Sequence, residues 1–363
     1  PLLLMAVIRL EIANLRNLQS VAILPHPHLN LLTGANGSGK TSVLEALHLL
    51  GLGRSFRSGR ARRLVNEAES ACTVFAQFED GGQAGIRRGA NGETALKVNN
   101  SSQVTIAQLV HRLPLCLLDP ESMDLLDSGS KPRRAQLDWG VFHVEHLFYP
   151  VWLRYQRALK QRNSLLRSGS MARLEAAVWH RELAESARQL HTFREYYLAK
   201  WQPQWESRMA VFLPDQSLSL DYIPGWDLAL PLEDQLADCW EKDVDRGHTQ
   251  IGPHRADLRV KRGTAPADEV LSRGQKKLVV CALKLSQVAL LQATGQQCVL
   301  LVDDLASELD ALARQRLIEV LAASGAQVFI TSIESGAVVP QLESTGSSFK
   351  MFHVEHGTVV EVT

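Results

Sequence analysis

A glycine-rich segment near the N-terminus has the residue types and the spacing of a phosphate-binding loop. It matches the pattern Gly-x-x-x-x-Gly-Lys-Thr in full. Its residues are Gly34, Ala35, Asn36, Gly37, Ser38, Gly39, Lys40 and Thr41, with Ser42 next in the chain. The glycines let backbone amides face phosphate oxygens at a helix N-terminus. Lys40 offers a positive charge to the β- and γ-phosphates, and Thr41 offers a hydroxyl ligand to Mg²⁺. The segment therefore predicts binding of ATP with Mg²⁺.

Two adjacent carboxylates follow an apolar segment in the C-terminal third. Val299 to Val302 predicts a buried strand, and Asp303 and Asp304 come directly after it. We expect Asp303 beside Thr41, as the second protein partner of Mg²⁺, and Asp304 to hold or activate the attacking water. An isolated Asp-Asp pair would more simply cap a helix, but the phosphate loop in the same chain favours catalysis. Lys40, Asp303 and Asp304 are the candidate catalytic residues.

A pentapeptide upstream of these acids predicts a second phosphate contact. Ser272, Arg273, Gly274 and Gln275 follow Leu271 and open a predicted helix that runs to Leu291. A helix N-terminus with a hydroxyl and a glycine can receive an anion. The phosphate loop already surrounds one side of a triphosphate, so the natural target is the γ-phosphate bound to a second copy of the chain. ATP would then join a homodimer. A plain serine N-cap is the simpler alternative.

Both ends of the chain supply the elements that would position these residues. Residues 29–33 predict a buried strand leading into the loop, and residues 41–52 predict the helix after it. Near the C-terminus, a strand at 297–302, a helix at 311–323 and a strand at 327–331 alternate as in a parallel sheet. The ATP-binding fold is therefore expected to join segments from opposite ends of the sequence.

The remaining segments predict one antiparallel and one helical part. Residues 6–24 and 71–99 read as short strands separated by turns. Residues 151–167 and 171–212 predict two antiparallel helices joined at Ser168-Gly169-Ser170, with Pro203 bending or ending the second. We therefore predict an α/β protein with a parallel sheet, an antiparallel β subdomain and an inserted, mainly helical lobe.

The predicted division has three parts. Residues 5–118 form the N-terminal part of an ATPase domain, 119–215 the inserted helical lobe, and 216–363 the C-terminal part of the ATPase domain. The last part holds the pentapeptide, the acidic strand and the loop Ser307-Glu308-Leu309-Asp310.

Basic residues are distributed unevenly, although 39 Lys and Arg balance 39 Asp and Glu. Residues 131–200 hold 13 basic and 6 acidic residues, a net charge of +7, and residues 298–363 hold 3 and 9, a net charge of −6. A polyanion should therefore meet one face only. The candidate DNA contacts are Arg57, Arg60, Arg62, Arg63, Lys131, Arg133, Arg134, Arg154, Arg157, Lys160 and Arg162. Arg54 and Arg57 lie close enough to the phosphate loop to bind ATP instead, and any of these residues could simply form a solvated face.

Composition narrows the class of protein. The chain has 45% hydrophobic and 21% charged residues. It contains no apolar run long enough to span a membrane, so no membrane partner is expected. Five scattered cysteines favour reduced thiols and therefore a cytoplasmic protein. Pro1 to Leu4 has no signal-peptide character, and we interpret it as a cloning remnant or an unprocessed extension before Met5. The repeats His143-Val144-Glu145-His146 and His353-Val354-Glu355-His356 lack a metal-protease spacing.

The order of these motifs resembles that of the ABC-type ATPases, in the branch of chromosome maintenance and recombination. More closely, the chain from Met5 onwards is similar to the RecF family of bacterial recombination mediators. The segments that carry the similarity are Gly53-Arg54-Ser55-Phe56-Arg57, Lys131-Pro132-Arg133-Arg134 with Leu137-Asp138, Gly252-Pro253-His254-Arg255-Ala256-Asp257-Leu258, and Leu271-Ser272-Arg273-Gly274-Gln275-Lys276-Lys277. The resemblance implies an ATP-dependent homodimer, slow hydrolysis, binding of double-stranded and gapped DNA, and work with RecR and RecO in loading RecA.

The chain departs from transporter ATPases in two respects. Thr331-Ser332 stands where a transporter-type switch histidine would follow the strand. A Gln-loop glutamine is also hard to place, since Gln77 comes early and Leu118-Asp119-Pro120-Glu121 has none. The rival functions are a transporter ATPase subunit and a DNA-bridging protein that needs no loading partner.

Overall fold

The computed structural model describes residues 6–99, 101–168, 173–304 and 309–362. Two compact units make up the chain. Unit 1 combines the N-terminal part up to residue 123 with the C-terminal part from residue 291, and unit 2 is residues 124–290. The predictions for residues 1–4, for Gly169-Ser170 and for Ser307-Glu308 lie outside the described residues. In this division, residues 216–290, which include the pentapeptide, belong to the same unit as the inserted helices.

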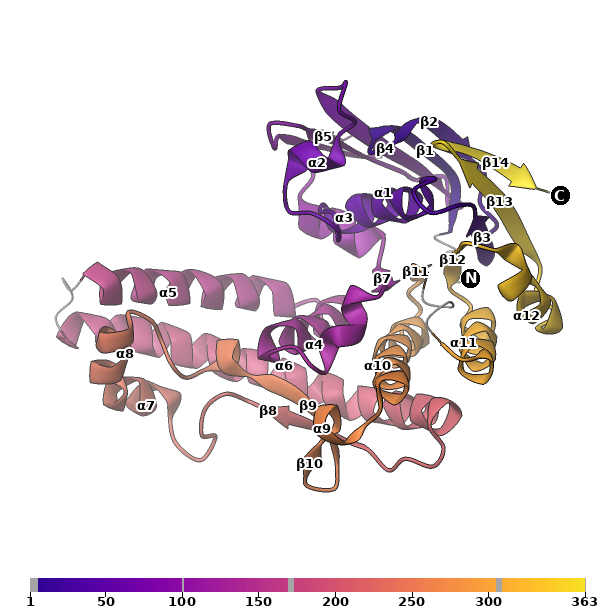
Figure 1. The fold of residues 1–363 in the computed structure, drawn as a ribbon. Helices are drawn as coiled ribbons and strands as arrows, with labels where there is room; N and C mark the ends of the chain where they lie inside the picture. The colour runs from indigo at the N-terminus through magenta and orange to yellow at the C-terminus, as the bar shows by residue number, and fades with distance from the viewer. Residues whose placement is uncertain (1–5, 100, 169–172, 305–308, 363) are drawn as a thin grey trace. The chain divides into compact units, whose positions relative to one another are not determined.

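An antiparallel sheet forms one layer of unit 1 (Figure 1). Its strand order is β2-β1-β4-β5-β6. The strands are β1 (Val7–Leu15), β2 (Leu18–Ile23), β4 (Ala71–Phe78), β5 (Gln83–Gly89) and β6 (Thr94–Val98). Buried and accessible residues alternate along β4, because one face of the sheet packs on the core. Gln77, which was considered for the Gln-loop position, lies within β4, where it pairs with Arg9 and Gln83.

A second, mainly parallel sheet has the order β14-β13-β3-β12-β11-β7. Its strands are β3 (Leu29–Thr33), β7 (Leu115–Leu118), β11 (Val299–Val302), β12 (Gln327–Ser332), β13 (Phe349–Glu355) and β14 (Thr358–Val362). β3 lies between β12 and β13 and is parallel to both, with Leu31 opposite Ile330. The predicted pairing of the two ends of the chain is therefore confirmed. The three strands β3, β11 and β12 are buried on both faces, as is usual in a parallel sheet.

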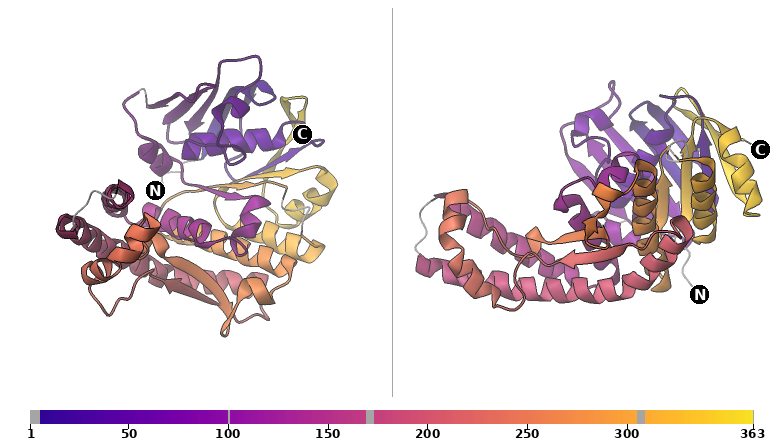
Figure 2. Two further views of the ribbon diagram at one scale, coloured as in Figure 1. Left: turned by 60° about the vertical axis from the view of Figure 1, so that its left-hand side comes forward. Right: turned by 60° about the horizontal axis from the view of Figure 1, so that its bottom comes forward.

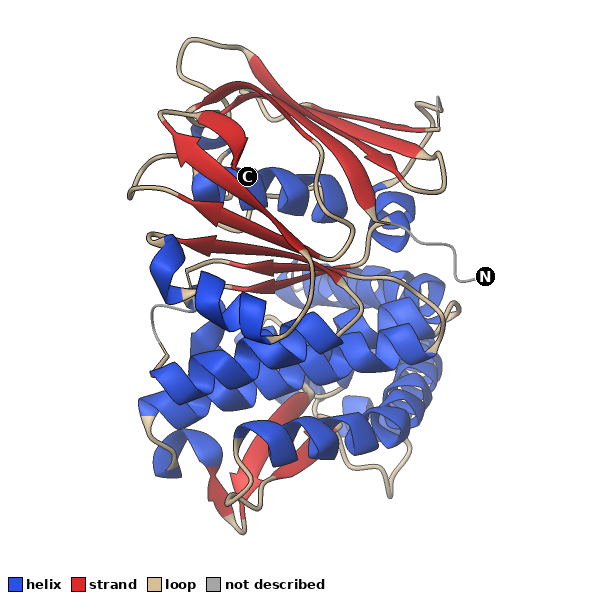
Figure 3. Cartoon of the chain, turned by 90° about the vertical axis from the view of Figure 1, so that its right-hand side faces the viewer, coloured by secondary structure: helices blue, strands red, loops and turns tan. Residues whose placement is uncertain are grey.

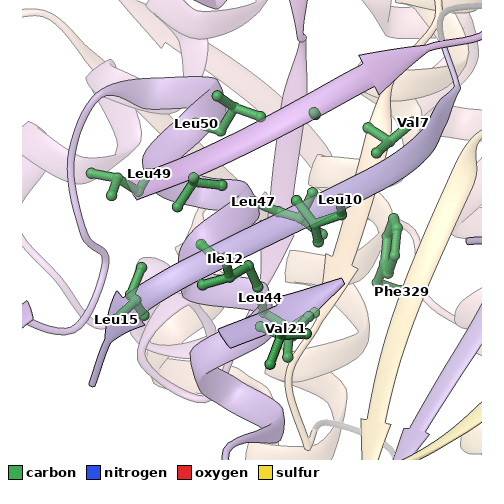
Figure 4. Packing of buried hydrophobic residues seen from close by; sticks show 14 of the residues in the cluster. Val7, Leu10, Ile12, Leu15, Val21, Leu44, Leu47, Leu49, Leu50 and Phe329 are labelled. Atoms are coloured by element: carbon green, nitrogen blue, oxygen red, sulfur yellow. The ribbon is translucent and has the colours of Figure 1, made fainter. Parts of the chain in front are cut away.

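Helix α1 (Lys40–Leu52) lies between these two sheets (Figure 3). The apolar residues of this predicted helix are fully buried, namely Val43, Leu44, Leu47 and Leu50. They pack with β1, β2 and Phe329 of β12 in one hydrophobic cluster (Figure 4). Full burial of each such side chain contributes about 1.5–3 kcal/mol. Because sheets cover α1 on both sides, the helix that begins at Lys40 is held rigidly. The other helices of unit 1 are α2 (Ala61–Leu64), α3 (Ile106–Arg112), α11 (Ala311–Ala323) and α12 (Val339–Ser344).

Unit 2 is mainly helical. Its helices are α4 (Ser130–Val144), α5 (Phe148–Ser168), α6 (Arg173–Phe212), α7 (Leu232–Asp238), α8 (Trp240–Arg246), α9 (Ala267–Val270) and α10 (Arg273–Ala293), the last of which continues into unit 1. A three-stranded antiparallel sheet completes it, with β8 (Ser219–Ile223), β9 (Asp257–Arg262) and β10 (Ala265–Pro266). The predicted combination of a parallel sheet, an antiparallel subdomain and an inserted, mainly helical lobe is thus confirmed.

Helix α6 decides between the two effects expected of Pro203. It continues through Pro203 to Phe212, so the proline does not end it. The helix curves along its length (Figure 2). Packing of the buried Trp201 and Trp205 on either side of the proline offsets the backbone hydrogen bond that proline cannot make. None of the described helices is long and apolar enough to cross a membrane.

The segment Gly252–Asp257 connects three helices of unit 2. The Pro253 carbonyl oxygen accepts a hydrogen bond from Arg194 of α6 at 3.0 Å, and His254 Nδ1 lies 2.6 Å from the Tyr155 hydroxyl of α5. The Ala256 carbonyl oxygen accepts from Arg134 of α4 at 2.7 Å. This segment, which carried much of the family resemblance, therefore serves as a structural connection within unit 2.

A buried ion pair joins α5 to α8. Arg162 donates to Asp243 Oδ2 and to Thr249 Oγ1, both at 2.7 Å, and neither the Arg162 nor the Asp243 side chain has exposed surface. The prediction that Arg162 contacts DNA is wrong, because its guanidinium group is enclosed by the protein.

Replacing Asp243 by alanine should lower the free energy of unfolding by about 3–5 kcal/mol, because the buried charge of Arg162 would lose its partner. Chemical denaturation of the single variant and of the double variant Arg162→Met/Asp243→Leu measures this effect. The double variant should regain most of the lost stability, since it leaves no unpaired charge. Lys350→Ala, which opens a partly exposed pair with Glu361, is the matched control and should cost at most about 1 kcal/mol. Equal losses for Asp243→Ala and Lys350→Ala would contradict this assignment.

Candidate ATP-binding site

The carboxyl ends of β3, β11 and β12 converge on one pocket of unit 1. In a parallel sheet, the loops after neighbouring strands meet at the same edge. The pocket measures about 580 Å³ and includes Lys40, Thr41, Asp303, Asp304 and Thr331. Asn36, Gly37, Gly39 and Ser42 also line it. The structure thus brings together residues from the two ends of the sequence.

Thr41 and Asp303 are in direct contact. Thr41 Oγ1 donates a hydrogen bond to Asp303 Oδ1 at 3.0 Å. Burial raises the pKa of the Asp303 carboxyl, and the hydrogen bonds from the Thr331 and Thr41 hydroxyls oppose that shift. A hydroxyl and a carboxylate side by side are hard oxygen ligands of the kind Mg²⁺ prefers. These two residues therefore fit the predicted Mg²⁺ site.

Lys40 is folded back over the phosphate loop. Its Nζ donates to the carbonyl oxygens of Gly34 at 2.7 Å and Ala35 at 3.0 Å. Burial lowers the pKa of Lys40, while the nearby carboxylates of Asp304 and Asp303 raise it. Lys40 is the first residue of α1, and a buried ammonium group at a helix N-terminus suits a phosphate group.

Two turns that are distant in the sequence form hydrogen bonds to the phosphate loop, and no sequence motif predicted these contacts. In the turn between β1 and β2, Asn17 Nδ2 donates to the Ser38 carbonyl oxygen at 2.9 Å and to that of Gly37 at 3.2 Å. In the turn between β13 and β14, the Gly357 amide donates to the same Ser38 oxygen at 2.9 Å. Gly357 has a φ of 78°, and a Cβ there would lie 2.1 Å from the Asn17 carbonyl oxygen. Only glycine fits this close approach.

The two His-Val-Glu-His segments have different structural settings. His143 is buried in α4, whereas residues 353–356 belong to β13 and its turn, directly before Gly357. Among the described residues, no group of three His, Cys, Asp or Glu side chains could hold a metal ion. The second segment therefore shapes the turn that contacts the phosphate loop.

The arginines after α1 are exposed, and only some of them line the pocket. Arg57 and Arg63 line the pocket, as does Arg16 of the β1–β2 turn. Arg57 also lies 3.7 Å from the buried carboxylate of Glu45, which receives two hydrogen bonds from Arg16. Arg54 is exposed but is not among the residues that line the pocket.

The pentapeptide of unit 2 forms a capping box. Ser272 Oγ accepts a hydrogen bond from the Gln275 amide at 3.3 Å, and Gln275 Oε1 accepts one from the Ser272 amide at 3.0 Å. This arrangement satisfies two donors at the start of α10. Ser272 is therefore an N-cap, as the simpler alternative predicted. This role is compatible with anion binding, because the hydroxyl that accepts this hydrogen bond still has its own proton to donate. Ser272, Arg273 and Gly274 are exposed.

Several basic residues of unit 2 are engaged within the protein. Arg133 pairs with Asp257 at 2.9 Å, and Arg134 donates to the Ala256 carbonyl oxygen. Arg154 lies between Glu182 at 2.9 Å and Glu185 at 3.4 Å. These interactions give all three arginines a structural role. Lys131, Arg157 and Lys160 are exposed, as are Arg60 and Arg62 of unit 1, although Arg62 donates to backbone oxygens of Asn66 and Glu67.

Comparisons with known proteins agree with this geometry. Residues 6–359 match the family model described as RecF/RecN/SMC N terminal domain. The chain is 46% identical to the DNA replication and repair protein RecF of Stutzerimonas stutzeri (strain A1501) over 363 residues, which cover 99% of this chain and 98% of the relative. It is 44% identical to the protein of the same name from Acinetobacter baylyi, over 98% of this chain and 99% of the relative.

Solved structures show the same similarity. The recombination mediator protein RecF with ATP, described as part of the RecFOR pathway, superposes with a TM-score of 0.87 at 26% identity, and covers 99% of this chain and 98% of that one. An SmcHead bound to the C-winged helix domain of ScpA superposes with a TM-score of 0.61 at 14% identity over 99% of this chain and 98% of that one, which shows a shared fold alone. From the family model, the identity and the coverage together, the chain belongs to the RecF family of ABC-type ATPases.

Proposed function

We propose that this chain is an ATP-dependent DNA-binding protein of recombinational repair and replication restart. ATP would close two copies into a dimer on double-stranded or gapped DNA, and slow hydrolysis would release them. The observation that carries the proposal is the contact of Thr41 with Asp303, in a pocket that also contains Lys40. The names of the similar RecF proteins, which mention DNA replication and repair, support the biological setting.

Each residue of the pocket has a proposed task. Lys40 and the loop amides bind the β- and γ-phosphates. Thr41 and Asp303 hold Mg²⁺, which when bound offsets the negative charge of the phosphates. Asp304 orients the attacking water and accepts its proton. Hydrolysis is expected to be weak, since Asp is one methylene shorter than Glu and reaches less far toward the water. Its dependence on DNA is a further part of the proposal.

The second half of the ATP site would come from the partner copy. Ser272 retains a hydroxyl proton within its capping box, and Arg273, Gly274 and Gln275 extend an exposed helix N-terminus. The γ-phosphate bound to one copy can accept from this group on the other. ATP binding would therefore assemble the dimer and hydrolysis would open it.

The proposed partners are DNA, RecR, RecO and RecA. We propose Arg60, Lys131, Arg157 and Lys160 as DNA contacts, because these residues are exposed and none of them lines the ATP pocket. A similar solved protein is described as a recombination mediator in the RecFOR pathway, which supports RecR and RecO as partners. Loading of RecA is proposed from the family resemblance alone.

Lys40→Ala should weaken ATP binding by about 10–100-fold, because a charged donor to phosphate contributes about 1.5–3 kcal/mol. Fluorescence titration with a labelled ATP analogue measures the affinity. Asp304→Asn should bind ATP with nearly unchanged affinity and lose most hydrolysis, since that residue acts on water. Lys350→Ala, outside the pocket, is the matched control. Unchanged affinity in Lys40→Ala would refute the assigned pocket.

Ser272→Arg should bind ATP as a monomer and fail to dimerise, because the added cation fills the place of the γ-phosphate contact. Sedimentation velocity with ATP, ADP or no nucleotide, each with and without duplex DNA, measures the assembly. Ser272→Asp separates the two roles of the serine: aspartate is an equally good N-cap, yet its charge repels phosphate. It should melt like the wild type and remain monomeric with ATP. An ATP-dependent dimer of Ser272→Asp would exclude the role in trans.

The charge reversal Arg157→Glu/Lys160→Glu should weaken duplex DNA binding and reduce the slope of log K against log salt concentration by about 2, since each phosphate contact contributes about 0.9. Fluorescence anisotropy over a series of increasing salt concentrations measures the slope. Arg154→Ala, which removes a residue already paired with two glutamates, should change the slope little. A double variant with the slope of the wild type would argue against α5 as a DNA contact.

A further inference from the structure

Thr331 of β12 connects the two acidic residues of the site. Its side chain is fully buried next to β11. Thr331 Oγ1 donates to Asp303 Oδ1 at 2.8 Å and accepts from the Asp304 amide at 2.9 Å. A single hydroxyl thus contacts both members of the acidic pair, from the strand beside the one that carries them.

The two hydrogen bonds of Thr331 act on different parts of the acidic pair, the side chain of Asp303 and the backbone of Asp304. The bond to Asp303 reaches the same oxygen that Thr41 contacts, so two hydroxyls fix the direction of this carboxylate. The bond from the Asp304 amide holds a backbone with a φ of 48°. This left-handed conformation is unfavourable for a residue that carries a Cβ. Without the bond, the backbone of Asp304 would be free to relax toward a right-handed or extended conformation, and its side chain would turn with it.

We propose that Thr331 is a positioning residue for ATP hydrolysis, which sets the orientation of Asp303 and Asp304 from the position where a transporter ATPase carries a switch histidine. The role requires a buried group that donates one hydrogen bond and accepts another at the same time. A serine hydroxyl meets this requirement, and valine, which has the shape of threonine, does not. The inference rests on the proposed ATPase function and deepens it.

The decisive comparison uses Thr331→Val, Thr331→Ser and Ser332→Ala in the full chain. Thr331→Val should lower kcat at least tenfold, while the affinity for a labelled ATP analogue at saturating Mg²⁺ stays within about threefold, because Lys40 and the loop amides are untouched. The Mg²⁺ concentration that half-saturates binding of the analogue should rise several-fold, since Asp303 loses one of its two orienting bonds. This second readout does not depend on turnover.

Two variants serve as controls. Thr331→Ser should restore kcat to within about threefold of the wild type. Ser332→Ala changes the next residue, whose hydroxyl donates to the Glu334 carbonyl oxygen at 2.8 Å, and should leave kcat and Mg²⁺ dependence unchanged. Should Thr331→Val fail to fold, as judged by melting without nucleotide, Thr331→Cys replaces it, because a thiol is only a weak donor and acceptor.

The outcomes separate this inference from the proposed function. A wild-type chain that hydrolyses ATP, with no loss of rate after Thr331→Val, would overturn the positioning role alone. The positioning role also fails if Thr331→Ser is impaired as strongly as Thr331→Val, because the hydroxyl would then not be the active feature. A wild-type chain that neither binds nor hydrolyses ATP would instead refute the proposed function.

Discussion

The parallel pairing of β3 with β12, and of β12 with β11, is the constraint on which the candidate site depends. These strands come from residues 29–33, 299–302 and 327–332, yet they lie side by side with a continuous register. Because they run in the same direction, their carboxyl ends bring the phosphate loop, the acidic pair and Thr331 to one edge. Loss of this pairing would separate Thr41 and Thr331 from the acidic pair, whatever the local conformation of each motif.

The packing around α1 converts this topology into a rigid site. The helix is covered by the antiparallel sheet on one side and by the parallel sheet on the other, so nearly all of its residues are buried. Two turns then fix the loop before it, through Asn17 and Gly357, which both donate to the Ser38 carbonyl oxygen. A loop held in this way can present its amides to phosphate with little further ordering, and ordering is a principal cost of binding.

Several arginines of unit 2 form polar contacts inside the unit and do not contribute a free positive charge to its surface. Arg133, Arg134, Arg162 and Arg194 each bind a carboxylate or a backbone carbonyl of the same unit. Buried charges are stable only when they are paired and hydrogen-bonded. An excess of arginine in a sequence can therefore reflect internal pairing, and only the exposed remainder is available to a nucleic acid.

The sequence by itself determined the local chemistry and the class of fold. The phosphate loop, the acidic strand and the pentapeptide predict their roles because each depends on residues that are neighbours in the chain. Apolar patterns in the same way predicted α1, α11 and the three strands β3, β11 and β12 of the parallel sheet, since a short apolar run is a local property. The sequence predicted a helix over residues 171–212 but left open whether Pro203 bends or ends it, because the packing of Trp201 and Trp205 around the proline is a tertiary effect.

Only the tertiary structure decided which side chains meet. The bond of Thr331 to Asp303 and Asp304, the contact of Gly357 with the phosphate loop and the burial of Arg162 all join residues far apart in the sequence. A hydroxyl or a guanidinium group has the same local pattern whether it faces water, DNA or a carboxylate. Its partner is set by the register and packing of strands and helices, which no single segment encodes.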